Sequence, residues 1–216
     1  MTKEIKAFIL DLDGVITDTA EYHYKSWQKL ADEEDLFFNR EVNEHLRGVS
    51  RMESMDIILD GKEVPADVKK KWTDRKNEYY QKYLEEITKA DILDDMEAKL
   101  NKLKAEGFKL AVGSSSRNAR KVLKQLKITN LFDTISDGNS VEHAKPAPDL
   151  FLHTAEKLDL EPEECVVLED AKSGIEAALA ANMKAVGVGP EERVGKAHLV
   201  YANVDNIDFD EILAKF

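Results

Sequence analysis

The sequence predicts an α/β fold: a doubly wound parallel sheet as a Rossmann-like core, with an inserted helical bundle as a cap. Two patterns lead to this prediction. From residue 89 onward, short apolar runs typical of buried strands alternate with amphipathic segments typical of helices. Between the first apolar run and residue 89, the periodicity is helical almost throughout. We therefore expect an α/β core made of residues 1–16 and 89–216, and a helical-bundle cap domain made of residues 17–88.

The expected strands of the core are short, apolar and followed by polar or turn-forming residues. They cover residues 5–10, 110–112, 165–168 and 185–188, with a further short strand at residues 134–135. Helices are expected at residues 96–106, from about residue 118, at Asp149–Leu158 and at residues 174–181. In the first of these helices, Met96, Leu100 and Leu103 form one apolar stripe, and Gly107 ends it.

The cap is expected to consist of helices inserted directly after the first strand. Its longest helix covers residues 66–87, begins after Pro65 and brings Val68, Trp72, Tyr79, Tyr83 and Ile87 near one face. Shorter helices are expected at Ala20–Glu33, at residues 40–46 and at residues 52–59. An insertion at this point suits a cap over the carboxyl ends of the strands, which is where open α/β sheets bind ligands.

Composition excludes several classes of partner. The chain has 216 residues, 43% hydrophobic and 34% charged, and no apolar run approaches the length that crosses a bilayer. Its net charge of −12 repels nucleic acids and anionic membranes, which favours a small-molecule site with locally clustered cations. The N-terminus lacks the pattern of an export signal, and the single cysteine, Cys165, excludes an internal disulfide. We therefore expect a cytoplasmic monomer.

Two acids follow the first strand in the sequence Asp11-Leu-Asp13-Gly14. Residues two apart in an extended chain project to the same side, so both carboxylates would face one point at the edge of the sheet. Phosphoryl transfer can use such a pair, with one acid attacking phosphorus and the other carrying a proton. In isolation, the same residues also fit a simple turn after a strand.

A second pair of acids, Glu169 and Asp170, follows the most hydrophobic predicted strand. Four carboxylates at two strand ends would repel one another strongly unless a cation lay between them. Oxygen ligands and a phosphate substrate favour Mg²⁺. Taken alone, these acids could equally cap the helix that follows.

Two further segments could bind phosphate. Ser114-Ser-Ser116 stands between a strand and a helix, where hydroxyls and free N–H groups converge, although serines are also common helix caps. Lys145 stands before Pro146 and Pro148, in a loop stiffened by two fixed φ angles. Taken alone, however, such a lysine is usually a solvated surface residue.

Together these motifs resemble those of a known family. The segment Asp11-Leu-Asp-Gly-Val-Ile-Thr-Asp-Thr19 resembles the first motif of haloacid-dehalogenase-like phosphotransferases, and Asp18-Thr-Ala-Glu-Tyr-His-Tyr-Lys-Ser-Trp27 narrows the resemblance to members similar to β-phosphoglucomutase. Other signatures match in order and spacing at Gly48-Val-Ser-Arg51, Arg75-Lys-Asn77, Ser114-Ser-Ser-Arg-Asn118, Lys145-Pro-Ala-Pro-Asp149 and Leu168-Glu-Asp170. The resemblance covers most of the chain.

The resemblance implies a role for each matched residue in the core. Asp11 would be the nucleophile and Asp13 the general acid and base. Mg²⁺ would be bound by Asp11, by the backbone carbonyl of Asp13 and by Asp170, with Glu169 nearby. Lys145 and the matched serines and their neighbours would bind phosphate: Ser114 and Ser115 the transferring group, and Ser116, Arg117 and Asn118 the other phosphate of the substrate.

In the cap, the resemblance implies that Thr19 hydrogen-bonds Asp13. The substrate-binding or closure-controlling residues of the cap would be His23, Trp27, Gly48, Val49, Arg51, Ser54 and Lys76. Trp27 fits a core residue of the cap equally well. The implied reaction converts β-glucose 1-phosphate to glucose 6-phosphate through a bound β-glucose 1,6-bisphosphate, with this phosphosugar as the only partner.

Two rival hypotheses remain. A phosphatase on the same scaffold would use water in place of the sugar hydroxyl. A non-enzymatic receiver domain also groups acids, a hydroxyl and a lysine around a phosphorylated aspartate, but its nucleophile comes later in the sheet and it lacks a cap. The chain departs from the family pattern in a short segment at residues 59–64 and in Arg117, where lysine is common. Both departures concern substrate contacts.

Overall fold

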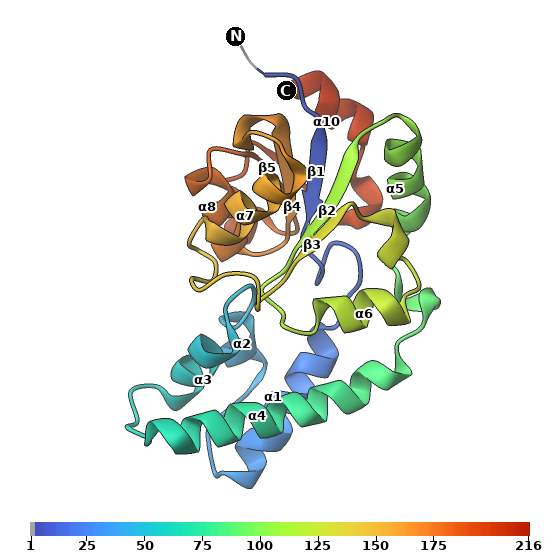
Figure 1. Ribbon diagram of the computed structural model, residues 1–216. Helices are drawn as coiled ribbons and strands as arrows, with labels where there is room; N and C mark the ends of the chain where they lie inside the picture. Colours follow the sequence, from blue (N-terminus) through green and yellow to red (C-terminus); the bar gives the residue numbers. More distant parts are fainter. Residues whose placement is uncertain (1–2) are drawn as a thin grey trace.

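The computed structural model describes residues 3–216 and contains a fully parallel sheet in the order β3-β2-β1-β4-β5-β6 (Figure 1). The strand order reverses between β1 and β4, which defines a doubly wound sheet and puts its ligand-binding edge at the carboxyl ends of these two strands. The strands are β1 (Ala7–Leu10), β2 (Lys109–Gly113), β3 (Thr134–Ser136), β4 (Cys165–Glu169), β5 (Lys184–Val188) and β6 (Leu199–Tyr201).

Helices cover both faces of the sheet. On one face, Phe8 and Leu10 of β1 pack in a cluster with apolar residues of three helices, and on the other face Ala7 and Ile9 do the same. The alternation within β1 follows from the two-residue period of a strand. The first face holds α5 (Met96–Ala105), α6 (Ala119–Gln125) and α10 (Phe209–Lys215), and the second holds α7 (Asp149–Leu158), α8 (Lys172–Ala180) and α9 (Glu191–Val194).

The cap consists of helices that lie beyond the carboxyl ends of the strands (Figure 1). It has a hydrophobic cluster of its own, which includes Trp27, Leu30, Met55 and Ile58. Its helices are α1 (Ala20–Glu33), α2 (Arg40–Glu44), α3 (Arg51–Leu59) and α4 (Ala66–Tyr83), and α4 continues into the short 3₁₀ helix η1 (Leu84–Glu86). The expected helical insertion is confirmed.

The chain passes between core and cap twice, and the two crossings are bonded to each other. Thr17 on the outgoing crossing forms an antiparallel bridge with Ile92 on the returning one. The Thr17 hydroxyl donates to the Asp91 carbonyl oxygen at 2.6 Å, and the Leu93 N–H donates to the Ile16 carbonyl oxygen at 2.9 Å. We call this pair of segments the hinge.

Most expected elements are confirmed, with ends that differ by a few residues, but two expectations about α4 are wrong. The helix ends at Tyr83, and its buried residues are Thr73, Lys76 and Tyr80, not the apolar face expected from Val68, Trp72, Tyr79 and Tyr83. The buried side of α4 carries polar groups because it faces Thr19 and His23 as well as the cap interior. The expected helix at residues 40–46 likewise ends at Glu44.

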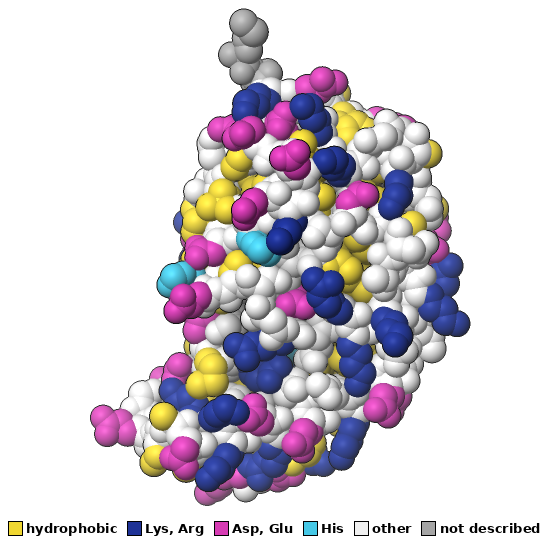
Figure 2. Space-filling view, viewed as in Figure 1, with side chains coloured by type: hydrophobic (Ala, Val, Ile, Leu, Met, Phe, Trp, Pro, Cys, Tyr) yellow, Lys and Arg dark blue, Asp and Glu magenta, His cyan; other side chains and the backbone are white. Residues whose placement is uncertain are grey.

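Three elements near the C-terminus were not predicted: α9, β6 and α10. The first two have only four and three residues, so they contain no periodicity to detect. None of the helices in the described part of the chain is both long and apolar enough to cross a membrane. Although the net charge is −12, Figure 2 shows several Lys and Arg side chains lying close together on the viewed face where core and cap meet.

Candidate active site

The site is built on the carboxyl ends of β1, β2 and β4. In the parallel register Leu10 pairs with Val112 on one side and with Leu168 on the other, so the residues that follow these strands emerge at one level. The Asp11 N–H continues the ladder by donating to the Leu168 carbonyl oxygen at 2.9 Å. Asp11 therefore lies next to Glu169, and its side chain is only 11% exposed.

Lys145 lies at the centre of this group and is completely buried. Its Nζ donates to Asp11 Oδ1 at 2.7 Å, to Glu169 Oε1 at 2.5 Å and to the Gly113 carbonyl oxygen at 2.9 Å. Burial alone would lower the pKa of Lys145, but the carboxylates of Asp11 and Glu169 outweigh it and raise that pKa above its ordinary value. The ammonium thus stays charged, with its three donors fixed. The Lys145–Pro146 peptide bond is cis.

Asp11, Glu169 and Asp170 each offer a carboxylate oxygen, and these oxygens lie within 4.8 Å of one another. Such an all-oxygen set fits Mg²⁺. The two oxygens of Glu169 already accept from Lys145 and, at 2.7 Å, from the Ala171 N–H. Asp11 and Asp170 are therefore better placed to hold a metal directly, while Glu169 holds the lysine. Burial, Glu169 and Asp11 together raise the pKa of Asp170, against the opposing effect of Arg193 and Arg47.

The second acid of the first motif has the environment of an acid–base group. Asp13 Oδ1 accepts a hydrogen bond from the Thr19 hydroxyl, which also lies 2.9 Å from the Tyr80 hydroxyl. Burial and the nearby Asp11 carboxylate raise the pKa of Asp13 to about 6, against the opposing effect of the Thr19 hydrogen bond. Gly14, at φ +79°, turns the chain so closely past Asp170 that a Cβ there would lie 2.5 Å from its carboxyl carbon.

The serine segment follows β2 and leads into α6. The Ser114 side chain is 2% exposed, and its hydroxyl accepts from the Ser116 N–H at 3.1 Å. The Ser116 hydroxyl accepts from the Asn118 N–H at 3.2 Å, so the turn holds itself in shape. Ser115 donates from its hydroxyl to the Gly48 carbonyl oxygen at 3.0 Å, which joins the core to the cap.

Arg51 reaches the same region from the cap. It begins α3, whose start is fixed by a capping box between Ser50 and Glu53. Its Nη2 donates to Asn77 Oδ1 at 2.7 Å, and Asn118 Nδ2 of the core donates to that same oxygen at 2.9 Å. Burial and the nearby Arg117 guanidinium lower the pKa of Arg51, as expected where cations gather for an anion.

Lys76, which is buried, and His23, which is half-buried, form a basic pair in the cap. Lys76 Nζ lies 2.8 Å from His23 Nδ1, 4.8 Å from the centre of the Trp27 ring and 4.9 Å from that of Tyr80. Burial and the Arg51 charge lower the pKa of Lys76 well below its ordinary value. Trp27 itself is 2% exposed and belongs to the hydrophobic cluster of the cap, which favours the core interpretation for this residue.

The remaining predicted residues lie around Arg51 and the serine segment. Ser54 is buried and donates to the Ser50 carbonyl oxygen at 3.0 Å, Val49 is half-buried, and Arg117 is exposed. Gly48 has φ +72°, and a Cβ there would lie 2.5 Å from Ser173 Oγ, so the cap backbone lies close against a core side chain at this point.

An ion-pair network also joins cap and core beside Asp170. Arg47 Nη1 of the cap lies 3.3 Å from Asp170 Oδ2, and Arg193 Nη2 of the core lies 3.7 Å from the same oxygen. Glu44 pairs with both arginines, at 2.9 Å from Arg47 Nε and 3.7 Å from Arg193 Nη1.

Comparison with known proteins agrees with this geometry. The family model described as "Haloacid dehalogenase-like hydrolase" matches residues 8–188. The chain belongs to the haloacid dehalogenase-like hydrolase family. As a member of that family, it has the doubly wound core and inserted cap that its sequence predicts.

Several haloacid dehalogenase-like relatives align over nearly the whole chain. Beta-phosphoglucomutase of Bacillus subtilis is 41% identical over 211 residues, which cover 95% of this chain and 93% of that protein. A phosphorylated carbohydrates phosphatase of Thermotoga maritima is 29% identical over 212 residues, covering 97% of both chains. The crystal structure of beta-phosphoglucomutase from Clostridium difficile matches with a TM-score of 0.94 and 42% identity, covering 98% of this chain and 96% of that one.

Several contacts at this haloacid dehalogenase-like site were not predicted. Tyr80 was missed because its neighbour Tyr79 was assigned to the buried face, although Lys76 and Tyr80 stand four apart on one side of α4. Asn77 was recognised only as part of a motif, without a contact. The partners of Asp170 in the cap and in α9, Arg47 and Arg193, gave no sequence signal, because their contacts depend on how the cap is seated.

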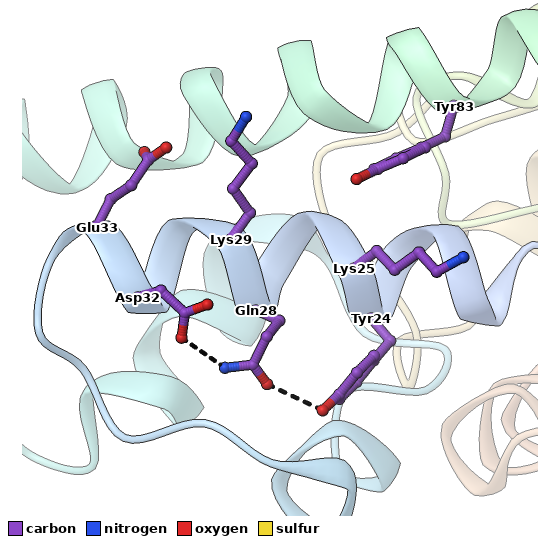
Figure 3. Close-up of a pocket in the computed structure, with 7 residues that line it drawn as sticks. All are labelled: Tyr24, Lys25, Gln28, Lys29, Asp32, Glu33 and Tyr83. Carbon is purple, nitrogen blue, oxygen red and sulfur yellow. Dashed lines mark hydrogen bonds between the residues drawn. The ribbon is translucent and has the colours of Figure 1, made fainter.

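A groove on the cap lies apart from these groups (Figure 3). It has a volume of about 390 Å³, and three of its polar side chains are hydrogen-bonded in a row. The Tyr24 hydroxyl donates to Gln28, whose amide donates to Asp32. The lining residues are Tyr24, Lys25, Gln28, Lys29, Asp32, Glu33 and Tyr83. None of them is a predicted site residue.

Proposed function

We propose that this enzyme is a β-phosphoglucomutase, which converts β-glucose 1-phosphate to glucose 6-phosphate through an enzyme-bound β-glucose 1,6-bisphosphate. The observation that supports the proposal is that the groups able to bind a phosphate form two separate sets. One, with Asp11 and Lys145, lies at the edge of the sheet, and the other, with Arg51 and Asn118, lies where cap meets core. A bisphosphate intermediate requires both sets. The 41% identity to beta-phosphoglucomutase of Bacillus subtilis supports this substrate.

Asp11 is the proposed nucleophile. One of its carboxylate oxygens attacks phosphorus, the bond from phosphorus to the sugar oxygen breaks, and an aspartyl phosphate forms. Lys145 and Ser114, with Ser115, stabilise the negative charge of the transferring group, and Glu169 keeps Lys145 in place. When bound by Asp11, Asp170 and the backbone carbonyl of Asp13, Mg²⁺ would neutralise charge on the phosphate oxygens.

Asp13 is the proposed carrier of the proton. It gives a proton to the sugar oxygen that leaves phosphorus, and it later takes one from the hydroxyl that attacks the aspartyl phosphate. A pKa of about 6 suits both steps near neutral pH. Thr19 holds the carboxylate in place, and Tyr80 holds Thr19.

The second set of groups is proposed to hold the phosphate that is not being transferred. Arg51 can bind it bidentately, with Ser116, Arg117 and Asn118 on the core side. The intermediate must turn round so that each of its phosphates meets Asp11 in turn. The sugar itself is proposed to contact His23, Gly48, Val49, Ser54 and Lys76, either directly or through closure of the cap, whereas Trp27 supports the cap from its hydrophobic cluster.

One NMR experiment tests the proposal. Wild-type enzyme is given β-glucose 1-phosphate with Mg²⁺ and a trace of β-glucose 1,6-bisphosphate, and the phosphorus signals are followed. We expect glucose 6-phosphate to accumulate much faster than inorganic phosphate. If release of inorganic phosphate were the main reaction, the enzyme would be a phosphatase and the mutase proposal would be wrong.

The phosphatase alternative rests on the relative in Thermotoga maritima. The variant Arg51→Ala separates the two. Losing a charge-assisted contact should slow mutase turnover roughly thirty- to a thousandfold. Hydrolysis of acetyl phosphate, which has no second phosphate, should slow much less because Asp11 and Lys145 are untouched. Equal slowing of both reactions would argue against the assigned role of Arg51.

The setting of the enzyme is also a proposal. We propose that it works as a monomer in the cytoplasm, where the buried Cys165 would stay reduced. We also propose that residues 17–88 move as the cap relative to a core of residues 1–16 and 89–216. The separate hydrophobic cluster of the cap supports this division.

A further inference from the structure

Asn77 joins three elements through a single atom. Its Oδ1 accepts from Arg51 Nη2 at 2.7 Å and from Asn118 Nδ2 at 2.9 Å. Asn77 lies on α4 and Arg51 begins α3, both in the cap, whereas Asn118 caps the start of α6 in the core. One amide oxygen therefore ties together the two sides of the cap–core boundary at the site of the second phosphate.

The orientation of the Asn118 amide is set from its other end. Gln81 Nε2, one turn after Asn77 on α4, donates to Asn118 Oδ1 at 3.3 Å. With its oxygen accepting from Gln81, Asn118 must direct its NH₂ group toward Asn77. Asn118 is buried, with 8% of the residue exposed, so few waters compete for these contacts.

Both donors keep free N–H groups while they are bonded to Asn77. A guanidinium has five N–H donors and a primary amide has two, and Asn77 uses one of each. The remaining donors of Arg51 and Asn118 are therefore available to a phosphate, and their directions are fixed by the shared acceptor. A neutral acceptor does this without adding negative charge beside an anion site.

We propose that Asn77 is a positioning residue for the second phosphate: its amide oxygen aligns Arg51 with Asn118 before the ligand arrives. The inference rests on the proposed function, since it concerns the phosphate that is not transferred. Without Asn77, both side chains would have to be ordered during binding. The free-energy cost of ordering them would oppose binding, so the affinity for the bisphosphate would fall.

The test measures binding without turnover. Calorimetry with β-glucose 1,6-bisphosphate is done on Asp11→Asn protein, which lacks the proposed nucleophile, and on the same protein carrying a second substitution. Asn77→Ala should weaken binding about tenfold. Asn77→Asp keeps the shape and the acceptor but sets a negative charge beside the phosphate, so it should weaken binding further, and added salt should reduce that extra loss.

Coupling to Arg51 distinguishes positioning from a general structural effect. In Arg51→Ala protein one of the two aligned donors is gone. Adding Asn77→Ala to that protein should therefore lower its bisphosphate affinity by less than about threefold. In protein with Asp11 intact, Asn77→Ala should raise the KM for β-glucose 1-phosphate more than it lowers kcat. The matched control is Asn101→Ala, an exposed asparagine on α5 whose amide bonds only to the Glu97 carbonyl oxygen, and it should bind bisphosphate as its parent does.

Three results would overturn the inference: Asn77→Ala within twofold of its parent in bisphosphate affinity, Asn77→Asp equal to its parent, or losses from Asn77→Ala and Arg51→Ala that simply multiply. Failure of the proposed function looks different, because wild-type enzyme would then make no glucose 6-phosphate whatever Asn77 does. If Asn77→Ala protein does not fold, as judged by its thermal midpoint, the bisphosphate affinity of the isosteric Asn77→Asp variant tests the inference instead.

Discussion

At the residue scale, the site is organised by one buried ammonium. Lys145 donates to Asp11, to Glu169 and to a backbone carbonyl, so its three N–H groups are all used. A flexible lysine held at three points becomes a fixed charge, and it is oriented before any phosphate arrives. Because Lys145 donates to Oδ1 of Asp11, the other carboxylate oxygen would be the attacking atom in the proposed reaction.

Asp13 gives a prediction in which stability and activity change in opposite directions. Its pKa in the folded protein is about 6, above the ordinary value of 3.8, so the folded state binds this proton more tightly than the unfolded chain does. The resulting stability is fully present below pH 4 and is lost as the pH rises through about 6. Asp13→Asn cannot ionise, so it should be more stable than wild type at pH 8 by on the order of 1 to 3 kcal/mol.

Urea unfolding with a chelator present checks this prediction from pH 4 to pH 8. The advantage of Asp13→Asn should shrink toward zero at the acid end, while its mutase activity should be nearly absent at every pH. In the wild type, kcat/KM should fall as the pH drops below about 6, because Asp13 must be ionised to accept a proton. A variant that is less stable than wild type at pH 8 would contradict the unfavourable burial of this carboxylate.

Much of the site at this scale could be predicted, and the reason is local. Asp11 follows β1, and Glu169 and Asp170 end and follow β4, so the pairing of these two strands alone brings the three carboxylates together. Contacts made by long side chains across the boundary could not be predicted. Arg193 reaches Asp170 from α9, a helix of four residues, and its contact with Glu44 depends on the position of another domain.

At the element scale, α8 packs so closely on the end of β4 that only glycine fits at one position. A Cβ on Gly174 would lie 1.9 Å from Glu169 Oε1, the oxygen that accepts from Lys145. The proposed catalytic lysine, the end of β4 and the start of α8 are therefore packed directly against one another. A change in the helix is expected to reach Lys145 through Glu169.

Gly174→Ala tests that packing. In an ordinary helix interior this change gains about 1 kcal/mol. Here Glu169 must move and leave Lys145 with one counter-charge fewer, so we expect a loss of roughly 2 to 5 kcal/mol and a large loss of activity. Gly61→Ala is the control, because Gly61 has φ +80° and open space around it, and it should cost only about 1 kcal/mol. A stabilised Gly174→Ala protein would refute the close packing.

The helices and strands themselves were predicted unevenly for physical reasons. Elements with a clear apolar period, such as α1 and α7, were found with their observed ends. The long helix α4 was found, but its orientation was not, because its buried side carries Lys76 and Tyr80 in polar contacts. Periodicity assumes that buried means apolar, and a helix that lines a site breaks that assumption.

At the scale of the whole molecule, the grouped carboxylates make Mg²⁺ binding a source of stability. The folded protein gathers oxygens of Asp11, Glu169 and Asp170, whereas an unfolded chain disperses them. Mg²⁺ at a hundred times its dissociation constant should stabilise the fold by about 2.7 kcal/mol, which raises Tm by several degrees. Differential scanning calorimetry measures this shift.

Asp170→Asn should remove most of that shift in Tm. The control is Asp94→Asn, an acid that lies beside Asp205 away from the site, and it should keep the shift. An equal Mg²⁺ response in wild type, Asp170→Asn and Asp94→Asn would mean that the ion acts on the acidic surface in general, and the metal site would have to be sought elsewhere.

The hinge would restrict the proposed movement of the cap relative to the core. The bridge between Thr17 and Ile92 holds the two crossings side by side. A single connecting segment would let the cap rotate about several axes and translate. Two segments bonded to each other leave mainly rotation about one axis. The position of the cap then reduces to one angle. Distances between several pairs of spin labels, each with one label on the cap and one on the core, should therefore rise and fall together, and any one of them reports the state of all.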